Sequence, residues 1–284
     1  MVNDRIAYLN GEFLPVNQAS ISPLDRGFLL GDGVYEVVPA YYRKLFHFEA
    51  HIDRLNQSLK SIRMEPCLNL EEWRSVLNTL IEKNQDEHQW IYLQVTRGAS
   101  PIRRHAIPNE ITPTMFATSY PNPLPTKETL SKGIKTIGVT DIRWKYCHIK
   151  TISRIAYVLM HQEAIDAGCS EAIIFNNGDA LECTISNLFI VRHGVIMTPP
   201  KSQQLLSGIT RDCILKIAEK NKIPYRETKI TERDLLKADE VWITSSTRGV
   251  HPVVEFNGQP IGKGQAGILW ERMWDLFLEE IRGC

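Results

Sequence analysis

The stretch Pro121-Asn122-Pro123-Leu124-Pro125 divides the sequence into two parts. Three prolines in five residues cannot continue a helix or a central strand, because proline has no backbone N–H to donate. A chain of 284 residues is also long enough for two domains, at about 100–200 residues each. We therefore predict a smaller N-terminal domain over residues 1–120, a linker over 121–126 and a larger C-terminal domain over 127–284.

The part before the linker alternates between strand and helix patterns. Asn10-Gly11 is typical of a hairpin turn, and Asn69 with Glu72 resembles a capping box that opens a helix. Elsewhere, apolar residues recur at helical or at alternating spacing. The predicted elements are a hairpin over 5–13, strands over 34–41, 90–97 and 114–119, and helices over 49–64 and from Asn69 onward.

The part after the linker continues in the same way. The predicted elements are strands over 134–140 and 240–245, a helix from Ser153 closed by Gly168, hairpins over 171–197 and at Asn257-Gly258, a helix near Ile209 and a C-terminal helix. The predicted fold class is α+β, with mixed sheets and helices in both domains. The sequence has no GxGxxG segment and no P-loop, which disfavours a parallel dinucleotide-binding fold.

The composition excludes several classes of protein. Lys plus Arg and Asp plus Glu both number 33, so no bulk charge attracts nucleic acid or an anionic membrane surface. No apolar run approaches the roughly 18 residues of a membrane span, and residues 1–16 show no secretory signal. The six cysteines form no CxxC pair and no zinc-type cluster, so we expect reduced thiols, a cytoplasmic location and no metal site.

Two N-terminal segments could carry chemistry. Three glycines within 25–36 imply unusual backbone angles or a close backbone approach, although a structural turn before a strand is the commoner cause. Arg54 lies at the border of the apolar face of its helix. It could hold a phosphate bidentately or extend along the helix surface into water, and the pattern alone favours the second.

Two further candidates are an amine and an acid. If 146–152 forms a strand, Lys150 shares a face with Tyr146 and His148, and partial desolvation would make its amine a nucleophile. Most such lysines simply point into water. Glu182 begins a mostly apolar strand, where a carboxylate either pairs with a cation or lies at the end of the sheet.

Two more segments suit an anion. Ile209 and Thr210 follow Gly208 at a helix start, where free amide donors and the helix dipole attract negative charge. Residues 244–247 are consecutive hydroxyl residues that could bind phosphate oxygens. Each segment could equally be a plain helix cap or turn. Together, the candidates supply an amine, an acid, an arginine, a helix start and a hydroxyl loop, which are the parts of a site for a phosphorylated aldehyde cofactor.

These segments, in this order, resemble the pyridoxal-phosphate enzymes of fold type IV. That group holds branched-chain aminotransferases, D-amino acid aminotransferases and aminodeoxychorismate lyases, and the resemblance is greatest to the D-amino acid aminotransferases. It runs from the first hairpin to the C-terminal helix. The matching segments are Asp25–Phe28, Gly31–Val38, His51–Leu55, Gln94–Gly98, Asp141–Trp144, Ile149-Lys150, Ser207–Asp212 and Thr244–Thr247.

The resemblance implies a role for each matching position. Lys150 would be the Schiff-base lysine, which also moves the proton at the substrate Cα. Glu182 would face the pyridine nitrogen of pyridoxal 5′-phosphate, and Ile185 would lie near the substrate side chain or the cofactor ring. The C-terminal domain would bind the cofactor. The residues implied to hold its phosphate are Arg54, Ile209, Thr210 and Ser246.

The substrate α-carboxylate would be bound by Tyr35 and an Arg-x-His loop. The loop is one residue longer between its prolines than the usual form, so it allows two alignments. Alignment on His105 places Arg103 beside the carboxylate, and we favour it because Arg-x-His then stays intact. Alignment on the first proline would place Ile102 or Arg104 there instead.

The implied reaction transfers the amino group of a D-amino acid, D-alanine above all, to 2-oxoglutarate and gives pyruvate and D-glutamate. In this family a loop of the neighbouring subunit completes the active site, so the resemblance implies a homodimer. The alternatives are an aminodeoxychorismate lyase or a branched-chain L-amino acid aminotransferase, both disfavoured by the Arg-x-His loop. A more remote alternative is a relative that kept the fold as a binding module without catalysis.

Overall fold

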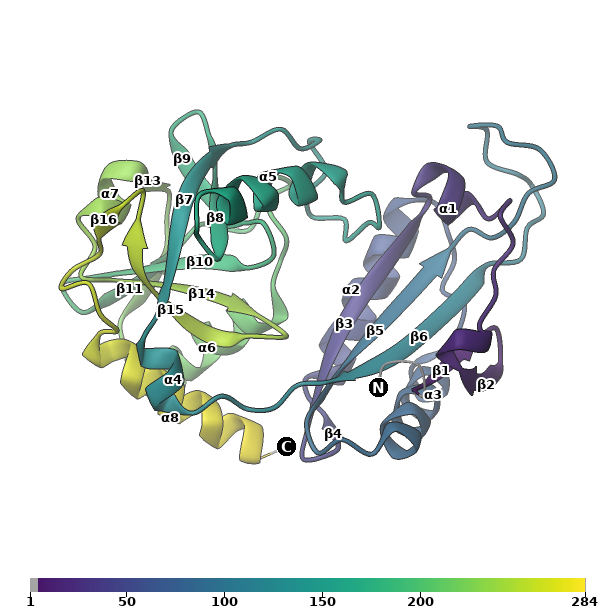
Figure 1. The fold of residues 1–284 in the computed structure, drawn as a ribbon, viewed down its shortest axis with the longest axis horizontal. Helices are drawn as coiled ribbons and strands as arrows, with labels where there is room; N and C mark the ends of the chain where they lie inside the picture. Colours follow the sequence, from purple (N-terminus) through teal and green to yellow (C-terminus); the bar gives the residue numbers. More distant parts are fainter. Residues whose placement is uncertain (1–4, 284) are drawn as a thin grey trace. The chain divides into compact units, whose positions relative to one another are not determined.

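The computed structural model describes residues 5–283, which form two compact units (Figure 1). The N-terminal unit holds residues 5–124 and Ile149–Ser153, and the C-terminal unit holds Pro125–His148 and 154–283. Each unit combines a sheet with packed helices, which confirms the α+β class. No helix within the described range is long and apolar enough to cross a membrane.

The N-terminal unit is built on a sheet with the strand order β2-β1-β6-β5-β3-β4. Its strands are β1 (Ile6–Leu9), β2 (Glu12–Pro15), β3 (Gly33–Tyr41), β4 (Lys44–Leu45), β5 (Gln89–Thr96) and β6 (Thr114–Pro121). Asn10 and Gly11 have φ angles of 50° and 103°, so the predicted hairpin is confirmed. All pairs described in this sheet are antiparallel, so the expectation of a mixed sheet is wrong here: strands that run in the same direction, such as β2 and β3, are not neighbours.

Two helices cover one face of this sheet, α2 (Phe48–Ser61) and α3 (Leu70–Asn84) (Figure 1). The predicted capping box at the start of α3 is confirmed, because Asn69 and Glu72 exchange both of its hydrogen bonds. Alternate strand residues point into the core between sheet and helices. Members of that core are Val34, Val38, Ile91, Leu93, Val95, Ile52, Leu55, Leu59, Trp73 and Leu77. A 3₁₀ turn (Val16–Gln18) and the short helix α1 (Arg26–Leu30) precede β3.

The C-terminal unit contains a mixed sheet with the order β12-β11-β10-β14-β15-β7-β8-β9-β13, and β16 pairs with β15. Its strands are β7 (Ile134–Thr140), β8 (Glu171–Asn176), β9 (Asp179–Cys183), β10 (Asn187–Arg192), β11 (Val195–Thr198), β12 (Tyr225–Glu227), β13 (Ile230–Thr231), β14 (Glu240–Ser245), β15 (Gly249–Phe256) and β16 (Gln259–Pro260). The parallel pairs are those of β7 with β15, β7 with β8 and β11 with β12.

Helices pack around this second sheet. They are α4 (Lys127–Ser131), α5 (Ile155–Asp166), α6 (Ile209–Lys220), α7 (Glu232–Leu236) and α8 (Ile268–Arg282). The helix α8 buries Trp270, Trp274 and Phe277. The helix α5 is different, because it buries Tyr157 and Met160 on one side and exposes apolar residues on the other.

Two local predictions are wrong. Residues 146–152 form no strand: the chain there pairs with β3 only around Thr151, and it passes from one unit to the other between His148 and Ile149. Ile149 packs against the N-terminal core, which explains why Ile149–Ser153 belongs to that unit although the sequence predicted a C-terminal domain over 127–284. Glu182 lies near the end of β9, not at the start of a strand.

Candidate active site

Lys150 is held beside the first residues of β3. The Tyr35 N–H donates to the Lys150 carbonyl at 3.0 Å, and the Lys150 N–H donates to Ser58 Oγ of α2 at 3.3 Å. These bonds fix the backbone from which the half-buried side chain extends. Its Nζ lies 4.3 Å from the ring centroid of Tyr35, a cation–π distance. The structure therefore brings together two residues that the sequence predicted as site residues.

The glycines before β3 serve backbone packing. The Ile152 N–H donates to the Gly33 carbonyl at 3.1 Å, and a Cβ at Gly33 would lie 2.7 Å from the Val95 carbonyl oxygen. Asp25 caps α1 by accepting from the Gly27 N–H at 2.7 Å. The motif at 25–36 thus has the structural role considered from the sequence, and through Gly33 it also sets the position of the segment that carries Lys150.

Arg54 does not extend into water, so that alternative is wrong. Its guanidinium donates from Nε to Glu36 Oε1 at 2.7 Å and from Nη2 to Oε2 at 2.9 Å. His51 Nδ1 lies 2.8 Å from Glu36 Oε2, and the Glu36 side chain has no exposed surface. Burial raises the pKa of Glu36, but the charge and hydrogen bonds of Arg54 and His51 outweigh it and hold the pKa well below its usual range. Burial lowers the pKa of His51.

Glu36 was not identified from the sequence. One signal could have found it, because Glu36 alternates with Val34 and Val38 on the inward face of a strand. A carboxylate at such a position needs a buried cation, and Arg54 was the neighbouring candidate.

Glu182 lies at the centre of a second cluster, in the C-terminal unit. Its carboxylate is almost fully buried and pairs with Arg143 Nη1 through Oε1, and its Oε2 accepts from the Leu206 N–H at 3.0 Å. Arg143 is itself held by Asp141, with bonds of 2.8 and 2.9 Å, and its Nη2 donates to the Gln204 carbonyl at 2.9 Å. The cation-paired alternative for Glu182 is therefore the one that the structure supports.

Burial and charge act in opposite directions on this pair. Burial raises the pKa of Glu182, and the charge of Arg143 and the Leu206 hydrogen bond offset part of that rise. Burial lowers the pKa of Arg143, but its hydrogen bonds to Asp141 and the charge of Glu182 outweigh burial and raise that pKa above its ordinary value. Arg143 belongs to a segment that the sequence singled out, 141–144, without a role for the side chain.

The start of α6 forms a polar cradle next to the same cluster. Gly208 is the N-cap, and no side chain caps the helix there. A Cβ at Gly208 would collide with Asn187 Oδ1, so glycine allows the close approach of β10. Asn187 is the direct cross-strand partner of Thr244, whose buried Oγ1 has no hydrogen-bond partner among the described residues.

The remaining predicted cofactor residues lie at the start of α6 and in the turn that follows β14. Ile209 and Thr210 begin α6, Thr210 is mostly buried, and Ser246 lies in the turn after β14. Asn187 also donates to the Leu206 carbonyl at 2.9 Å, and the Leu206 N–H binds Glu182, so the acid and the cradle share one framework. Uncapped amides and an unpaired buried hydroxyl are groups that an anion would satisfy.

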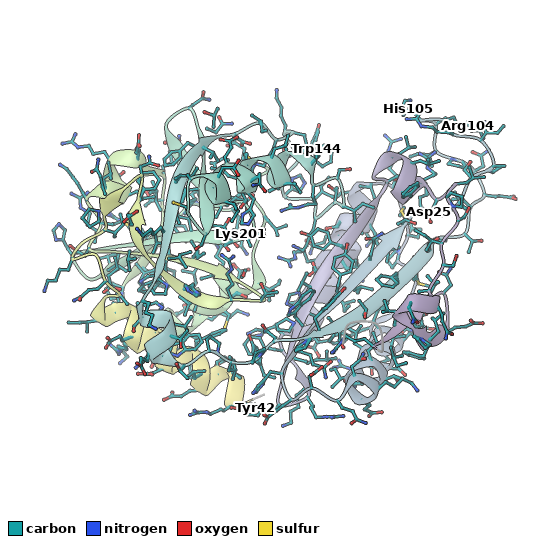
Figure 2. The ribbon with its side chains drawn as sticks, in the orientation of Figure 1. Asp25, Tyr42, Arg104, His105, Trp144 and Lys201 are labelled. Carbon is teal, nitrogen blue, oxygen red and sulfur yellow. The ribbon has the colours of Figure 1, made fainter. Side chains whose placement is uncertain are left out.

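The Arg-x-His loop is exposed. Arg103, Arg104 and His105 all point into solvent, and Figure 2 labels the last two on the long loop between β5 and β6. Arg26 holds the loop backbone by donating to the Arg104 carbonyl at 2.7 Å, while its Nε donates to Asp32 at 2.7 Å. The structure therefore fixes the loop at its backbone and leaves the three side chains available on the surface.

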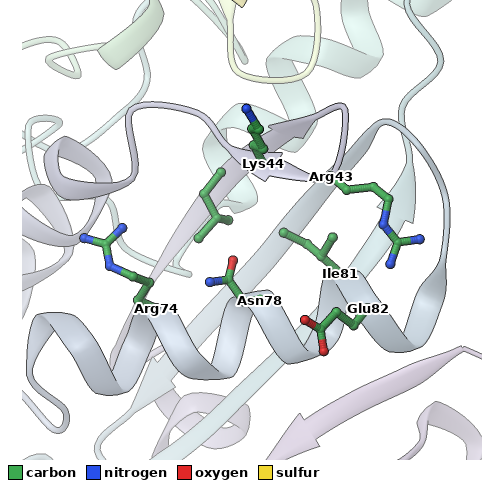
Figure 3. A pocket seen from close by; sticks show the side chains of 7 residues that line it. Arg43, Lys44, Arg74, Asn78, Ile81 and Glu82 are labelled. Atoms are coloured by element: carbon green, nitrogen blue, oxygen red, sulfur yellow. The ribbon is translucent and has the colours of Figure 1, made fainter. Parts of the chain in front are cut away.

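A groove of about 480 Å³ opens elsewhere on the N-terminal unit (Figure 3). Its walls include Arg43 and Lys44 on one side and residues of α3 on the other. Arg74 of α3 is engaged with Glu49 at 2.8 Å and with Glu71 at 3.3 Å. The groove contains none of the predicted site residues, so it is not the candidate active site.

The fold and these two clusters define a class of enzyme. The family model described as Amino-transferase class IV matches residues 33–256, and the chain belongs to this family. It is therefore an aminotransferase, which confirms the prediction from the motifs.

Named relatives narrow the comparison. The chain is similar to the D-alanine aminotransferase of Bacillus licheniformis, with 38% identity over 260 residues that cover 92% of this chain and 91% of the relative. The D-alanine aminotransferase of Staphylococcus haemolyticus is 36% identical over 273 residues, which cover 95% of each chain. The solved branched-chain amino acid aminotransferase of Escherichia coli has a TM-score of 0.88 and 25% identity, with 97% of this chain and 93% of that chain covered.

One solved structure also carries a cofactor. It is a branched-chain amino acid aminotransferase with pyridoxamine 5′-phosphate, to which this chain is 27% identical with a TM-score of 0.92. The match covers 100% of this chain and 96% of that chain. Together with the class IV family, this match indicates that the cofactor of the chain is pyridoxal phosphate.

Proposed function

We propose that this aminotransferase uses pyridoxal 5′-phosphate to move the amino group of a D-amino acid, D-alanine above all, to 2-oxoglutarate, giving pyruvate and D-glutamate. The observation that carries the proposal is the Lys150 amine held 4.3 Å from the Tyr35 ring centroid, because a fixed amine nucleophile is what a carbonyl cofactor requires. The names of relatives at 38% and 36% identity support the choice of substrate.

The residues of the C-terminal unit fit such a cofactor. The uncapped start of α6 and the unpaired Thr244 hydroxyl suit a phosphate group. The buried Glu182 carboxylate, oriented by Arg143, suits a protonated ring nitrogen. We assign Ile209, Thr210 and Ser246 to the phosphate and Glu182 to the ring nitrogen.

The mechanism divides the work among the residues of the chain. When bound, pyridoxal 5′-phosphate supplies an electrophilic carbonyl and a ring that takes up the negative charge developing at Cα. Lys150 removes the proton from Cα as a general base and delivers it again as a general acid. Glu182 stabilises a positive ring nitrogen, and the charge of Arg143 favours the ionised form of that carboxylate. Tyr35 lies beside the amine and binds the substrate carboxylate together with an Arg-x-His loop.

Arg54 is proposed as a further phosphate ligand. Arg54→Ala is expected to weaken cofactor binding about ten- to hundredfold, because a hydrogen bond to a charged group contributes about 1.5–3 kcal/mol. The same change breaks the buried pair with Glu36, which costs about 3–5 kcal/mol of folding free energy. Equilibrium dialysis with pyridoxal 5′-phosphate and chemical unfolding measure the two effects separately.

The double variant Arg54→Ala/Glu36→Gln distinguishes the two roles of Arg54. It removes the uncompensated carboxylate, so stability should recover in part while cofactor affinity stays low. If affinity recovers together with stability, Arg54 acts on the fold alone and is not a phosphate ligand.

The carboxylate-binding residues are proposed to be Tyr35, Arg103 and His105. Arg103→Leu should raise KM for both D-alanine and 2-oxoglutarate, because both substrates carry the same carboxylate, whereas simple amines without it should lose little. Arg104→Leu is the matched control and should do much less, since it removes an equally exposed charge from the same loop. Steady-state kinetics with each substrate measures the difference. The reverse order of the two variants would place Arg104 in the site.

We further propose a cytoplasmic homodimer in which the exposed loop enters the active site of the partner subunit. The outer face of α5 exposes Ile155, Val158 and Leu159, and a cluster of exposed apolar side chains on one helix is typical of a protein–protein interface. Sedimentation equilibrium should give twice the 32.5 kDa of the chain. Val158→Asp should shift the mass toward the monomer, and a wild-type monomer at micromolar concentration would contradict the proposal.

A branched-chain L-amino acid aminotransferase remains the second candidate. One observation favours it: the solved branched-chain enzyme with pyridoxamine 5′-phosphate has a TM-score of 0.92. Its sequence identity of 27% is lower than the 38% of the Bacillus licheniformis D-alanine aminotransferase, which favours the D-amino acid assignment. L-leucine as the better amino donor would reverse this order.

A further inference from the structure

Glu171, the first residue of β8, is a carboxylate with no exposed surface. Its Oε1 accepts hydrogen bonds from the Thr184 N–H at 3.1 Å and from the Thr184 hydroxyl. Its Oε2 accepts from Arg248 Nη1 at 3.2 Å and from Ser186 Oγ at 3.4 Å. One buried carboxylate thus joins the turn 184–186 to the turn that contains Arg248.

Both turns are next to residues proposed to hold the cofactor. The turn 184–186 begins two residues after Glu182, and Ser246 lies in the turn closed by Arg248. The strands that lead into the turns, β9 and β14, are not neighbours in the sheet. The first turn continues into β10, which pairs with β14 through Asn187 and Thr244, so the backbone brings the two turns close together. The side chain of Glu171 adds a direct connection between the turns themselves.

Thr184 is held on three sides. His161 Nδ1 of α5 lies 3.0 Å from Thr184 Oγ1, and it must be the donor because the single hydroxyl proton of Thr184 goes to Glu171. Arg154 donates to the Thr184 carbonyl at 2.9 Å. The N–H, the hydroxyl and the carbonyl of Thr184 all form hydrogen bonds, so a shift of Glu171 would also shift the turn 184–186.

A buried carboxylate is costly unless it is paired and hydrogen-bonded, and an apolar side chain could fill the same space at lower cost. A carboxylate at this position is explained by its hydrogen bonds to two separate turns, which hold the turns at a fixed distance from each other. We propose that Glu171 is a positioning residue that fixes the acid-bearing turn relative to the hydroxyl turn and thereby aligns Glu182 with the phosphate cradle. This inference rests on the proposed function.

Glu171→Gln tests the inference because it keeps the shape and removes the charge. The amide nitrogen of glutamine cannot accept, so one turn loses its acceptor. The Kd for pyridoxal 5′-phosphate, measured by absorbance titration, is expected to rise about tenfold or more. The Kd for pyridoxal, which has no phosphate, should change less, because only the phosphate would contact the hydroxyl turn. A merely structural role would weaken both probes equally.

Glu240→Gln is the matched control in the same unit. Glu240 accepts from the N–H groups of Leu269 and Trp270 at 2.9 and 2.8 Å, so its loss also removes hydrogen bonds. We expect a loss of stability without a change in either Kd. If Glu171→Gln does not fold, Arg248→Gln is the second variant, because it breaks only the link to the hydroxyl turn. It should weaken the binding of pyridoxal 5′-phosphate more than the binding of pyridoxal.

The outcomes separate this inference from the proposed function. A wild-type protein that binds no pyridoxal 5′-phosphate would overturn both. If the wild type binds it and Glu171→Gln or Arg248→Gln binds it equally well, only the positioning role is wrong. Equal losses for pyridoxal 5′-phosphate and pyridoxal would also overturn that role.

Discussion

Lys150→Ala is expected to abolish amino-group transfer while the protein stays folded. In the proposed mechanism, the substitution removes both the amine nucleophile and the group that moves the proton at Cα. Positioned acid–base transfer alone contributes about 10²–10⁴-fold, so the turnover number should fall by several orders of magnitude. The fold should survive, because the hydrogen bonds that hold residue 150 use its backbone N–H and carbonyl. Turnover with D-alanine and 2-oxoglutarate measures the effect.

Borohydride treatment gives an independent measurement on the same variant. Reduction in the presence of pyridoxal 5′-phosphate should add the cofactor mass to Lys150 in the wild type and to no residue in Lys150→Ala. Lys145→Ala is the control, since that lysine is nearby in the sequence and exposed. If the alanine variant transfers amino groups near the wild-type rate, Lys150 is not the catalytic amine.

Glu182→Gln is expected to slow the proton-transfer step far more than it weakens cofactor binding. The ring nitrogen would lose its charged partner, and removal of one such electrostatic group costs roughly 10²-fold in rate. Arg143 would keep its two bonds to Asp141, so the cluster should not lose its cation. Stopped-flow measurement of a single half-reaction with D-alanine isolates the step. Unchanged single-turnover rates, with Glu240→Gln as the control, would remove Glu182 from the mechanism.

Local signals in the sequence predicted much of the fold. The Asn10-Gly11 turn and the capping box of Asn69 and Glu72 depend on residues close in the chain, and both are confirmed. The segment 146–152 failed for a different reason. Its alternating pattern suggested a strand, but its conformation is set by contacts with β3 and α2, which lie about a hundred residues earlier.

The same distinction applies to the candidate site. Lys150, Glu182 and Arg54 were identified by residue type and resemblance. The buried partners of Arg54 and Glu182, which are Glu36 and Arg143, were given no role. A carboxylate or a guanidinium is expected at the surface unless a buried partner of opposite charge is known. The pairing of Glu171 with Arg248 joins residues that are distant in sequence, so it cannot be predicted from the spacing of residues along the chain.

The handedness of the substrate is the central claim of the proposed function. In the proposed site, a carboxylate bound by Tyr35, Arg103 and His105 would determine which substituent of Cα points toward the Lys150 amine, so only one enantiomer would lose its proton in a productive orientation. The most direct measurement follows cofactor absorbance in half-reactions with D-alanine and with L-alanine. We predict rapid conversion with D-alanine and little or none with L-alanine. Faster conversion with L-alanine, or with L-leucine than with any D-amino acid, would contradict the claim and favour the branched-chain assignment.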